Sequence, residues 1–448
     1  MHPLLIEYLF CLTSVFVLGC VVVSWLNVCV YRLPREERFW TALKNLSYPP
    51  SHCPRCQTPI KWYDNVPVLG WLRLGGRCRN CRGKISVRYP LVEFTTGCLF
   101  ALLYWCEVPL EWTASGGTLA HPYGPATLFS PPLTVVHVRF GLHVVLLSAL
   151  IVATLIDIDL RIIPDSVTLP AMTTAVAVQF LSGITYLVPV WYQTREMGDS
   201  LRSLTLPFQG SRAVESWLIN VSRFEGPVPW LGDHPHLHGL AVSLAGLLLG
   251  GAVIWGVRLA GFWALRMEAM GFGDVVLMAM IGSFVGWQGT LAVFILAPLL
   301  AVLGALATAS FRLGDYIPFG PYLSLATLLV LVGFRRFWPA LESSLLGLGP
   351  LLPLVALIML VSLVGMLSGW WAITRRLGWV DPAEEPQWVE QWLPADQLAY
   401  QAMENADPQQ GQWRPPAGQA WPGQLAGRGL GHYEAWRHPS GSGLRSTR

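Results

Sequence analysis

From residue 153 the chain reads Ala153-Thr154-Leu155-Ile156-Asp157-Ile158-Asp159-Leu160, and from residue 270 it reads Met270-Gly271-Phe272-Gly273-Asp274-Val275-Val276-Leu277. Each stretch sets an aspartate where a long apolar run meets water. A carboxylate at the edge of a bilayer is costly, so it usually faces the interior of a helix bundle and marks a functional site. Two carboxylates that share one proton can activate a water molecule. We therefore predict that Asp157 and Asp274 form a catalytic pair.

The composition around these two stretches is that of a membrane protein. Hydrophobic residues make up 53% of the 448 residues and charged residues only 13%, which argues against an ordinary soluble enzyme. The charges gather between long apolar runs, so we predict an all-α polytopic membrane protein with eight or nine transmembrane helices. The expected apolar runs cover residues 5–31, 91–106, 136–156, 167–190, 238–265, 274–287, 288–310, 321–334 and 351–374.

Basic residues set the expected orientation in the membrane. The first apolar run is too long for the core of a secretory signal, has no Lys or Arg before it, and is followed by Arg32 and Arg35. Because cytoplasmic loops carry an excess of Lys and Arg, residue 32 onward is expected in the cytoplasm. The loop 107–135 has no Lys or Arg. Counting spans places that loop and the insert 191–237 outside, and both aspartates on the cytoplasmic face.

We expect four regions along the chain. They are a first transmembrane helix (1–31), a cytoplasmic module (32–90), a helix bundle with its two outside inserts (91–374), and a cytoplasmic tail (375–448). The tail is rich in Gln, Pro, Gly and Trp without sustained periodicity, so we expect it to be disordered. A Gly246-x-x-x-Gly250 spacing inside the bundle indicates close helix packing.

Four cysteines of the cytoplasmic module form two C-x-x-C pairs, Cys53 with Cys56 and Cys78 with Cys81. Each pair can present two thiolates to a tetrahedral Zn²⁺, and the separation of the pairs suits a zinc ribbon. Disulfides are disfavoured because cytoplasmic thiols stay reduced, and a redox motif would not need the second pair. Four thiolates leave no open position for water, so the zinc is expected to be structural.

The remaining residues of the module fit a membrane surface. Its basic and aromatic content raises the alternative of nucleic-acid binding, but a basic cytoplasmic loop beside anionic lipid explains it without nucleic acid. The lipid bilayer is therefore the expected surrounding, with no nucleic acid partner. Five further cysteines lie in or beside apolar runs and are expected to be small buried hydrophobic residues. They are Cys11, Cys20, Cys29, Cys98 and Cys106.

Other acidic residues compete for the role of the first aspartate. Asp159 is about 200° around a helix from Asp157, so both cannot point at one partner. Asp165 follows Pro164, which ends or bends the helix, so it is expected to be a turn or capping residue. Asp315 is expected to be a cytoplasmic loop residue. The apolar approach to Asp157 favours it over these three.

A cluster of histidines, Asp233-His234-Pro235-His236-Leu237-His238, offers a second candidate metal site. Its two-residue spacing suits an extended strand with ligands on one side. No second cluster completes the site, so we interpret the segment as a solvated loop.

The order of these motifs resembles that of the prepilin peptidases, the type IV leader peptidases, which are membrane aspartic proteases of the Gly-x-Gly-Asp type. The similarity runs through most of the membrane part. It is carried by Ser24-Trp25-Leu26-Asn27-Val28-Cys29-Val30-Tyr31-Arg32-Leu33-Pro34, by Cys53 to Cys81 with Trp62-Tyr63-Asp64-Asn65-Val66-Pro67-Val68-Leu69, by Ile85-Ser86-Val87-Arg88-Tyr89-Pro90-Leu91-Val92-Glu93, by Leu155 to Asp165, by the motif ending at Asp274, and by Ile317-Pro318-Phe319-Gly320-Pro321.

The resemblance implies an integral endopeptidase of the bacterial inner membrane that cuts the positively charged leader from prepilins and pseudopilins after a glycine. Its catalytic pair maps onto Asp157 and Asp274. Many members of this family also N-methylate the new terminus with S-adenosylmethionine, an activity associated with the cysteine module. Gly271 and Gly273 lack side chains, so we expect an extended substrate backbone to lie beside Asp274.

The chain departs from the family pattern in three ways. Val276 replaces a usual lysine, Val23 replaces a usual glycine, and the insert 191–237 lengthens the separation of the two aspartates. Two other functions are open on the sequence. A family member that has lost its chemistry would act as an assembly scaffold. A transporter would use intramembrane acids to carry protons, but no repeated halves are visible.

Overall fold

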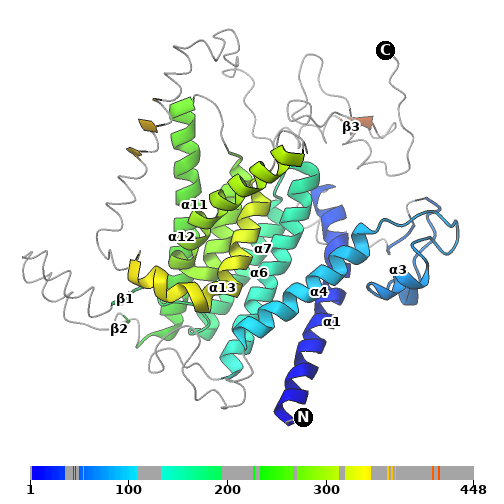
Figure 1. Cartoon of the computed structure of the whole chain (residues 1–448), viewed down its shortest axis with the longest axis horizontal. Helices are drawn as coiled ribbons and strands as arrows, with labels where there is room; N and C mark the ends of the chain where they lie inside the picture. The colour runs from blue at the N-terminus through cyan, green and yellow to red at the C-terminus, as the bar shows by residue number, and fades with distance from the viewer. Residues whose placement is uncertain are drawn as a thin grey trace, which may run out of the picture.

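The structure is a computed structural model that is helical through almost all of the chain that it describes (Figure 1). It describes residues 3–35, 50–53, 55–108, 133–193, 233–265, 270–311 and 318–344, with a few isolated positions and residue pairs outside these ranges. Two antiparallel pairs of two-residue strands join β1 (Tyr192–Gln193) to β2 (Gly226–Pro227) and β3 (Ala406–Asp407) to β4 (Gln412–Trp413). The predicted all-α fold class is confirmed.

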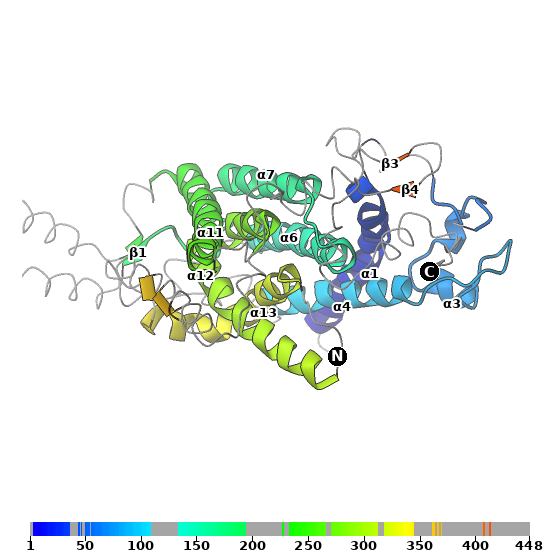
Figure 2. The same cartoon turned by 90° about the horizontal axis from the view of Figure 1, so that it is seen from above.

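Seven long helices make up the part of the membrane region that the structure describes. They are α1 (Pro3–Arg32), α4 (Arg88–Glu107), α6 (Leu133–Leu160), α7 (Asp165–Ser182), α11 (Pro235–Leu265), α12 (Phe272–Phe311) and α13 (Gly320–Ser344). The short elements are η1 (Leu33–Arg35), η2 (Trp62–Asp64) and α3 (Leu69–Arg73). Helices α6, α7, α11, α12 and α13 form a bundle, while α1 and α4 pack on each other at its side and carry α3 at the edge of the molecule (Figure 2).

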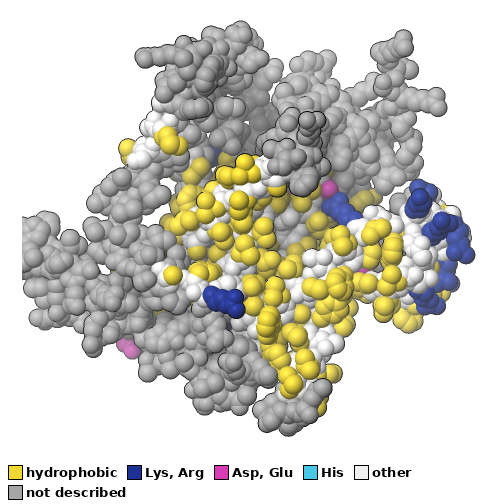
Figure 3. Space-filling model, viewed as in Figure 1, with side chains coloured by type: hydrophobic (Ala, Val, Ile, Leu, Met, Phe, Trp, Pro, Cys, Tyr) yellow, Lys and Arg dark blue, Asp and Glu magenta, His cyan; other side chains and the backbone are white. Residues whose placement is uncertain are grey.

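Within the described ranges, four helices are long and apolar enough to cross a membrane. The qualifying segments are Leu5–Arg32, Val135–Leu160, Pro235–Phe262 and Phe272–Ala307. Many large hydrophobic side chains are exposed on these helices, and on the face seen in Figure 3 they cover much of the bundle, while Lys and Arg gather around α3. Such an apolar exterior belongs in lipid, so the protein is a multi-pass membrane protein. The number of eight or nine spans stays a prediction, because 351–374 lies almost wholly outside the described residues.

Helix α12 consists of two antiparallel halves. Gly286 in its middle has non-helical angles (φ 73°, ψ 173°). Gly273 and Gly304, near its two ends, would be about 45 Å apart in a straight helix. Instead, both lie near the start of α13, because Gly304 contacts Tyr322 and Gly273 reaches Gly320 through Ile163. The chain therefore reverses at Gly286, which agrees with the two separate apolar runs expected at 274–287 and 288–310.

Glycines let α11 approach the first half of α12 closely. A side chain on Gly246 would overlap the carbonyl oxygen of Gly282, and one on Gly250 would overlap that of Met278. Small residues at such crossings allow backbones to meet, which maximises dispersion contacts where lipid supplies no hydrophobic drive. The packing role predicted for the Gly246-x-x-x-Gly250 spacing is confirmed.

The run predicted at 167–190 was wrong at its end, because α7 stops at Ser182. Gly183 takes a left-handed conformation (φ 73°) that terminates the helix. The following apolar residues form a loop whose backbone polar groups bond to side chains of the bundle. His238 Nε2 accepts from the Val190 backbone N–H at 3.1 Å, and Trp287 Nε1 donates to the Val190 carbonyl at 2.5 Å. An apolar run alone does not distinguish a helix from a buried loop.

The prediction that all five remaining cysteines are buried was also wrong. Cys20 and Cys29 are buried and Cys106 is partly so, but Cys11 and Cys98 are exposed. Both exposed thiols lie on outward faces of α1 and α4, which are apolar. An apolar stretch of sequence therefore predicts that a cysteine lies in apolar surroundings, but it does not show whether these are the protein interior or lipid.

Candidate active site and candidate metal centre

Asp157 lies in the last turn of α6 and is buried, with 6% of its surface exposed. Its carboxylate accepts a hydrogen bond from the backbone N–H of Gly320, the first residue of α13. A Cβ on Gly320 would fall 2.5 Å from Asp157 Oδ2. Only glycine at this position lets the backbone of α13 approach the carboxylate so closely. The sequence motif containing Gly320 had given this residue no role of its own.

The end of α6 fixes the position of Asp157. Arg161 adopts a left-handed conformation (φ 59°), and its backbone N–H donates to the Asp157 carbonyl at 2.9 Å. This is the single-bond cap that commonly ends a helix, and Pro164 follows it. The Arg161 guanidinium also acts electrostatically on the Asp157 carboxylate. A cation four residues after an acid is near it in a helix, and although Arg161 lies just past the end of α6, this spacing is the signal that could have found it.

Asp274 enters the same site from another helix. It is partly buried in the first turn of α12, where the N-terminal end of the helix dipole favours a negative charge. Its carboxylate is close enough to Asp157 for the two to interact electrostatically. Asp157, Asp274 and Gly320 therefore meet at one end of the bundle from α6, α12 and α13.

The two glycines beside Asp274 have different surroundings. The Cβ position of Gly273 lies 3.1 Å from Cβ of Ile163, so that the isoleucine side chain occupies the space beside it. Gly271 is exposed, and open space lies where its side chain would be. Packing already explains the glycine at 273. Contact of either glycine with substrate stays a prediction.

The competing aspartates have other partners. Arg88 donates from Nη1 to Asp159 Oδ1 at 3.0 Å and pairs with Oδ2 through Nη2 at 2.8 Å. Asp159 therefore faces α4, whereas Asp157 faces α13, as the predicted rotation around the helix requires. Asp165 is the first residue of α7, where a carboxylate is favoured by the helix dipole. Asp315 lies outside the described residues.

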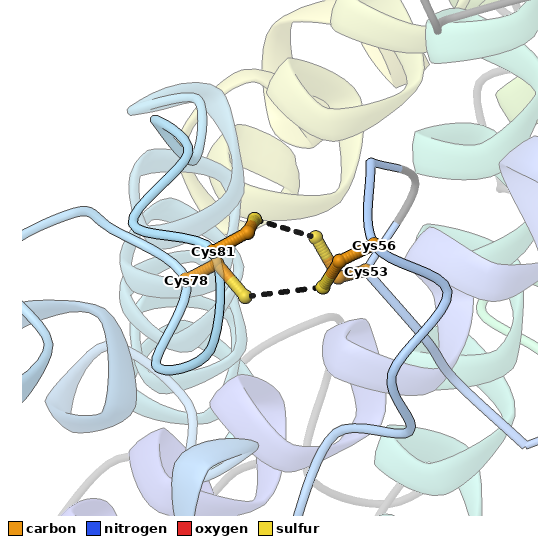
Figure 4. A group of neighbouring side chains, drawn as sticks. All are labelled: Cys53, Cys56, Cys78 and Cys81. Atoms are coloured by element: carbon orange, nitrogen blue, oxygen red, sulfur yellow. Dashed lines mark hydrogen bonds between the residues drawn. The ribbon is translucent and has the colours of Figure 1, made fainter.

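The two cysteine pairs form two turns of the same design. Cys53 N–H donates to Thr58 and Cys78 N–H to Gly83, each closing a loop around one pair. The residue after each second cysteine, Gln57 or Arg82, has a positive φ of 56° or 55°. These turns aim the thiols of each pair at those of the other (Figure 4).

The four sulfurs converge on one point. Cys53 Sγ lies 3.8 Å from Cys81 Sγ, and Cys56 Sγ lies 3.9 Å from Cys78 Sγ. All four are within 4.8 Å of one another. Tetrahedral zinc with Zn–S bonds of about 2.3 Å requires sulfurs about 3.8 Å apart, so the cluster fits that ion. The predicted convergence is confirmed, and the identity of the metal stays a prediction.

The thiols differ in acidity. Hydrogen bonds from the Thr58 side chain and backbone lower the pKa of Cys56 to about 6. Backbone hydrogen bonds at Cys81 and Asn80 lower the pKa of Cys78. Although a backbone hydrogen bond from Gly83 acts the other way, desolvation and the neighbouring thiols raise the pKa of Cys81 to about 11. Thiols so close cannot all ionise without a cation, and a bound metal would supply it.

Polar contacts hold the two turns together. Asn80 Nδ2 in the second turn donates to Thr58 Oγ1 in the first at 2.8 Å. Arg79 donates from Nε to Asp64 Oδ2 at 2.7 Å, and this ion pair lowers the pKa of Asp64. The module thus depends on metal ligation and surface polar bonds, as expected of a domain too small for a large core.

The predicted histidine patch is not a solvated loop throughout, because α11 begins at Pro235. His236 Nδ1 contacts the Phe180 carbonyl oxygen at 2.9 Å. His238 is buried and holds the 185–190 loop against the bundle. Among the described residues, only the four cysteines group as potential metal ligands. These histidines therefore serve packing.

One buried ionisable pair was missed by sequence reasoning. Glu107 at the end of α4 and His143 on α6 are both 1% exposed, and Glu107 Oε1 lies 2.5 Å from His143 Nδ1. The pair joins α4 to α6 at the end of these helices away from Asp157. A glutamate directly after one apolar run and a histidine inside the next were the available signal, since isolated charges rarely enter a membrane without a partner.

Two family profiles match parts of the chain. The sequence profile described as the bacterial peptidase A24 N-terminal domain matches residues 17–107. The profile of the type IV leader peptidase family matches residues 227–306, which include Asp274. Asp157 lies between the two matched ranges. No solved structure matches the chain.

Curated relatives cover most of the chain. A type 4 prepilin-like proteins leader peptide-processing enzyme of Escherichia coli O78:H11 (strain H10407 / ETEC) is 30% identical over 319 residues, 68% of this chain and 88% of the relative. The chain belongs to the type IV leader peptidase family.

Two further members of this family have names that give two activities. The prepilin leader peptidase/N-methyltransferase of Aeromonas salmonicida strain A449 is 29% identical over 70% of this chain and 87% of its own length. That of Pseudomonas aeruginosa PAO1 is 28% identical over 72% and 89%. The family predicted from the motifs is confirmed.

Proposed function

We propose that the protein is a membrane aspartic endopeptidase that removes the leader peptide of type IV prepilins or pseudopilins. The observation that carries this proposal is the meeting of Asp157 and Asp274, from helices far apart in sequence, at one end of an apolar bundle. Two carboxylates in such a place are energetically costly, so their presence there indicates a function. The names of the relatives supply the class of substrate.

The chemistry needs one proton shared by the two carboxylates. Close negative charges repel, so one carboxyl stays protonated while the other is ionised. The ionised carboxylate takes a proton from water as its oxygen attacks the scissile carbonyl carbon. The protonated carboxyl donates a hydrogen bond to the carbonyl oxygen. When the tetrahedral intermediate collapses, the C–N bond breaks and the protonated carboxyl gives its proton to the leaving amine, so that the pair again holds one proton, the one taken from water.

Several groups around the pair act on its charge. Burial and the neighbouring Asp274 oppose a negative charge on Asp157, while the Gly320 N–H and the Arg161 cation favour one. Asp274 has the N-terminus of α12 behind it and the open space at Gly271 beside it. An extended peptide could lie in that space with its scissile bond against the pair, which is the substrate-binding role that we propose for Gly271 and Gly273.

We place this site at the cytoplasmic face of the inner membrane. The module that carries the cysteines is basic, and it joins the same end of the helices as the aspartates through the Arg88–Asp159 pair. Basic segments stay on the cytoplasmic side. A prepilin leader, which carries positive charge, would then be cut where its apolar segment leaves the membrane.

The cysteine cluster is proposed to hold zinc as a structural ion. Four thiolates complete its coordination, so the metal would stabilise the module without taking part in hydrolysis. We further propose that the protein N-methylates the cleaved terminus with S-adenosylmethionine, on the strength of the relatives' names and the match of the N-terminal profile. The alternative function, an inactive assembly scaffold, would leave the close approach of two acids without a purpose.

A cleavage assay tests the proposal. The full chain in lipid vesicles is incubated with a prepilin from the same genome, and the product is measured by mass. We expect cleavage after the leader glycine by the wild type and none by Asp157→Ala or Asp274→Ala. Equal cleavage by the wild type and both variants would refute the assignment of the pair. Absence of cleavage by a folded, zinc-loaded wild type would favour the scaffold.

A further inference from the structure

One ion pair links the cysteine module to the helix that carries Asp157. Arg88 is the first residue of α4 and lies near the end of the module. Its Nη1 donates to Oδ1 of Asp159 at 3.0 Å, and its Nη2 contacts Oδ2 at 2.8 Å. A planar guanidinium that meets a carboxylate in this two-pronged way fixes orientation as well as distance.

The position of Asp159 gives this link its significance. It lies in the last turn of α6, two residues after Asp157. The same turn is capped by the Arg161 N–H on the Asp157 carbonyl. Last turns of helices fray readily unless they are held. Arg88 therefore holds the turn that presents Asp157 to Gly320.

The other end of the link is attached firmly to the module. Glu93, just over one turn after Arg88 on α4, accepts a hydrogen bond from the Val68 backbone N–H at 2.7 Å. Val68 has φ 58°, which is strained for a β-branched residue. The carboxylate of Glu93 thus pins the loop before α3 onto α4. A continuous set of contacts runs from the module through α4 to the end of α6.

Helix α4 packs mainly on α1, and its buried pair with α6, Glu107–His143, lies at the other end of these helices. The ion pair itself is partly exposed, with 46% of the Arg88 side chain and 17% of the Asp159 side chain accessible. Such pairs contribute little to the stability of a fold. The pair is therefore better suited to positioning a neighbouring group than to holding the protein together.

We infer that Arg88 and Asp159 are positioning residues that couple the four-cysteine module to the aspartate site. An intact module holds Arg88, Arg88 holds the last turn of α6, and that turn sets Asp157 against Gly320 and Asp274. The inference rests on the proposed peptidase function for its effect on rate. Its structural part, the ordering of the end of α6, stands apart from activity.

The test compares full-length proteins in lipid vesicles. The variants are Arg88→Ala, Asp159→Ala, Arg88→Lys and the charge swap Arg88→Asp with Asp159→Arg, with Lys84→Ala as the control at an exposed cation of the same module. Three quantities are measured for each protein. They are kcat and KM for prepilin cleavage, bound zinc per chain, and amide hydrogen exchange of the last turn of α6.

We expect kcat to fall about tenfold to a hundredfold in both alanine variants, since small misplacements of reacting groups cost this much. KM and zinc content should change less than twofold. Arg88→Lys should lie between, because an ammonium cannot grip both oxygens. The swap should recover much of the rate, and Lys84→Ala should match the wild type. Exchange at the end of α6 should rise where kcat falls.

Other results would overturn the inference. Alanine variants with wild-type kcat would show that the pair does not position Asp157. A charge swap as slow as the single variants would show that the two residues act separately. If the wild type itself does not cleave, the proposed function fails, and the exchange measurement then decides alone. Unchanged exchange in Arg88→Ala would overturn the coupling.

Discussion

The cysteine module and the aspartate site lie at the same end of the molecule but are assembled in opposite ways. The four thiols come from two similar turns within residues 53–81, each closed by its own backbone hydrogen bonds. The two carboxylates come from the end of α6 and the start of α12, and the backbone of α13 completes their surroundings. The first site is local in sequence, and the second depends on the packing of the whole bundle.

This difference implies that the two sites respond differently to damage. A local site fails through its ligands, because the ligands are also what folds it. A site built by packing fails through any residue that sets the distance between its helices. The predictions below separate these two cases.

The largest effect is expected at the metal ligands. Replacing Cys56 and Cys78 by serine should abolish zinc binding, because two of the four thiolate ligands are lost. The module should then lose its fold, because structural zinc contributes about 10–16 kcal/mol to such modules. Elemental analysis should give one zinc per chain in the wild type and none in the variant, and limited proteolysis should cut the variant within residues 50–87. Cys98→Ser, at an exposed thiol of α4, is the control that should keep its zinc. A wild type without zinc would contradict the assignment of the metal.

A single methyl group should disturb the packed site. In Gly320→Ala the new Cβ would lie 2.5 Å from Asp157 Oδ2, so the carboxylate must move, and kcat should fall about a hundredfold. Zinc content should not change. Gly256→Ala, where open space surrounds the new Cβ in α11, should cleave like the wild type. Full activity of Gly320→Ala would show that the approach of α13 to Asp157 does not matter.

Sequence and structure agreed best where the contacts are local. The spacing of Cys53, Cys56, Cys78 and Cys81 was enough to predict their convergence. The backbone hydrogen bond that closes each turn joins residues only five positions apart. The rotation of a helix was also enough to separate Asp157 from Asp159.

Long-range packing could not be predicted in the same way. Nothing in the sequence showed that Gly320 would meet Asp157, or that Ile163 would fill the space beside Gly273. The end of α7 at Ser182 was missed because the hydrogen bonds that satisfy the following loop come from α11 and α12. These contacts join residues far apart in the chain, and a one-dimensional pattern does not contain them.

Acidity should control the local site over the neutral range. Metal binding requires thiolates, and the pKa values of about 6 for Cys56 and about 11 for Cys81 mean that at pH 7 the second thiol still carries a proton. Zinc binding needs all four thiolates and displaces at least that proton, so affinity should fall at least about tenfold as the pH drops from 8 to 7. Below pH 6 the fall should steepen, since Cys56 is then protonated too. Competition with a chelator at several pH values measures this, and a flat profile would contradict it.

The smallest effect is expected at Val276, where the family usually has lysine. Position 276 is about 200° around the helix from Asp274, so a lysine there would act weakly on the carboxylate. A nearby cation favours the ionised form. Val276→Lys should therefore extend cleavage to slightly lower pH and change the rate by less than about threefold, as pH–rate profiles would show. If the wild type is inactive and Val276→Lys is active, Val276 is what inactivates the chain.

The central claim is that Asp157 and Asp274 act as one unit. The most direct test is single-turnover cleavage of a prepilin by Asp157→Asn, Asp274→Asn and the double variant. Groups that share one catalytic step are strongly non-additive. We predict that each single variant loses about 10⁴-fold in rate and that the double variant is no slower than either. Substantial activity in one single variant, or a double variant slowed by the product of the two single losses, would contradict a shared catalytic pair.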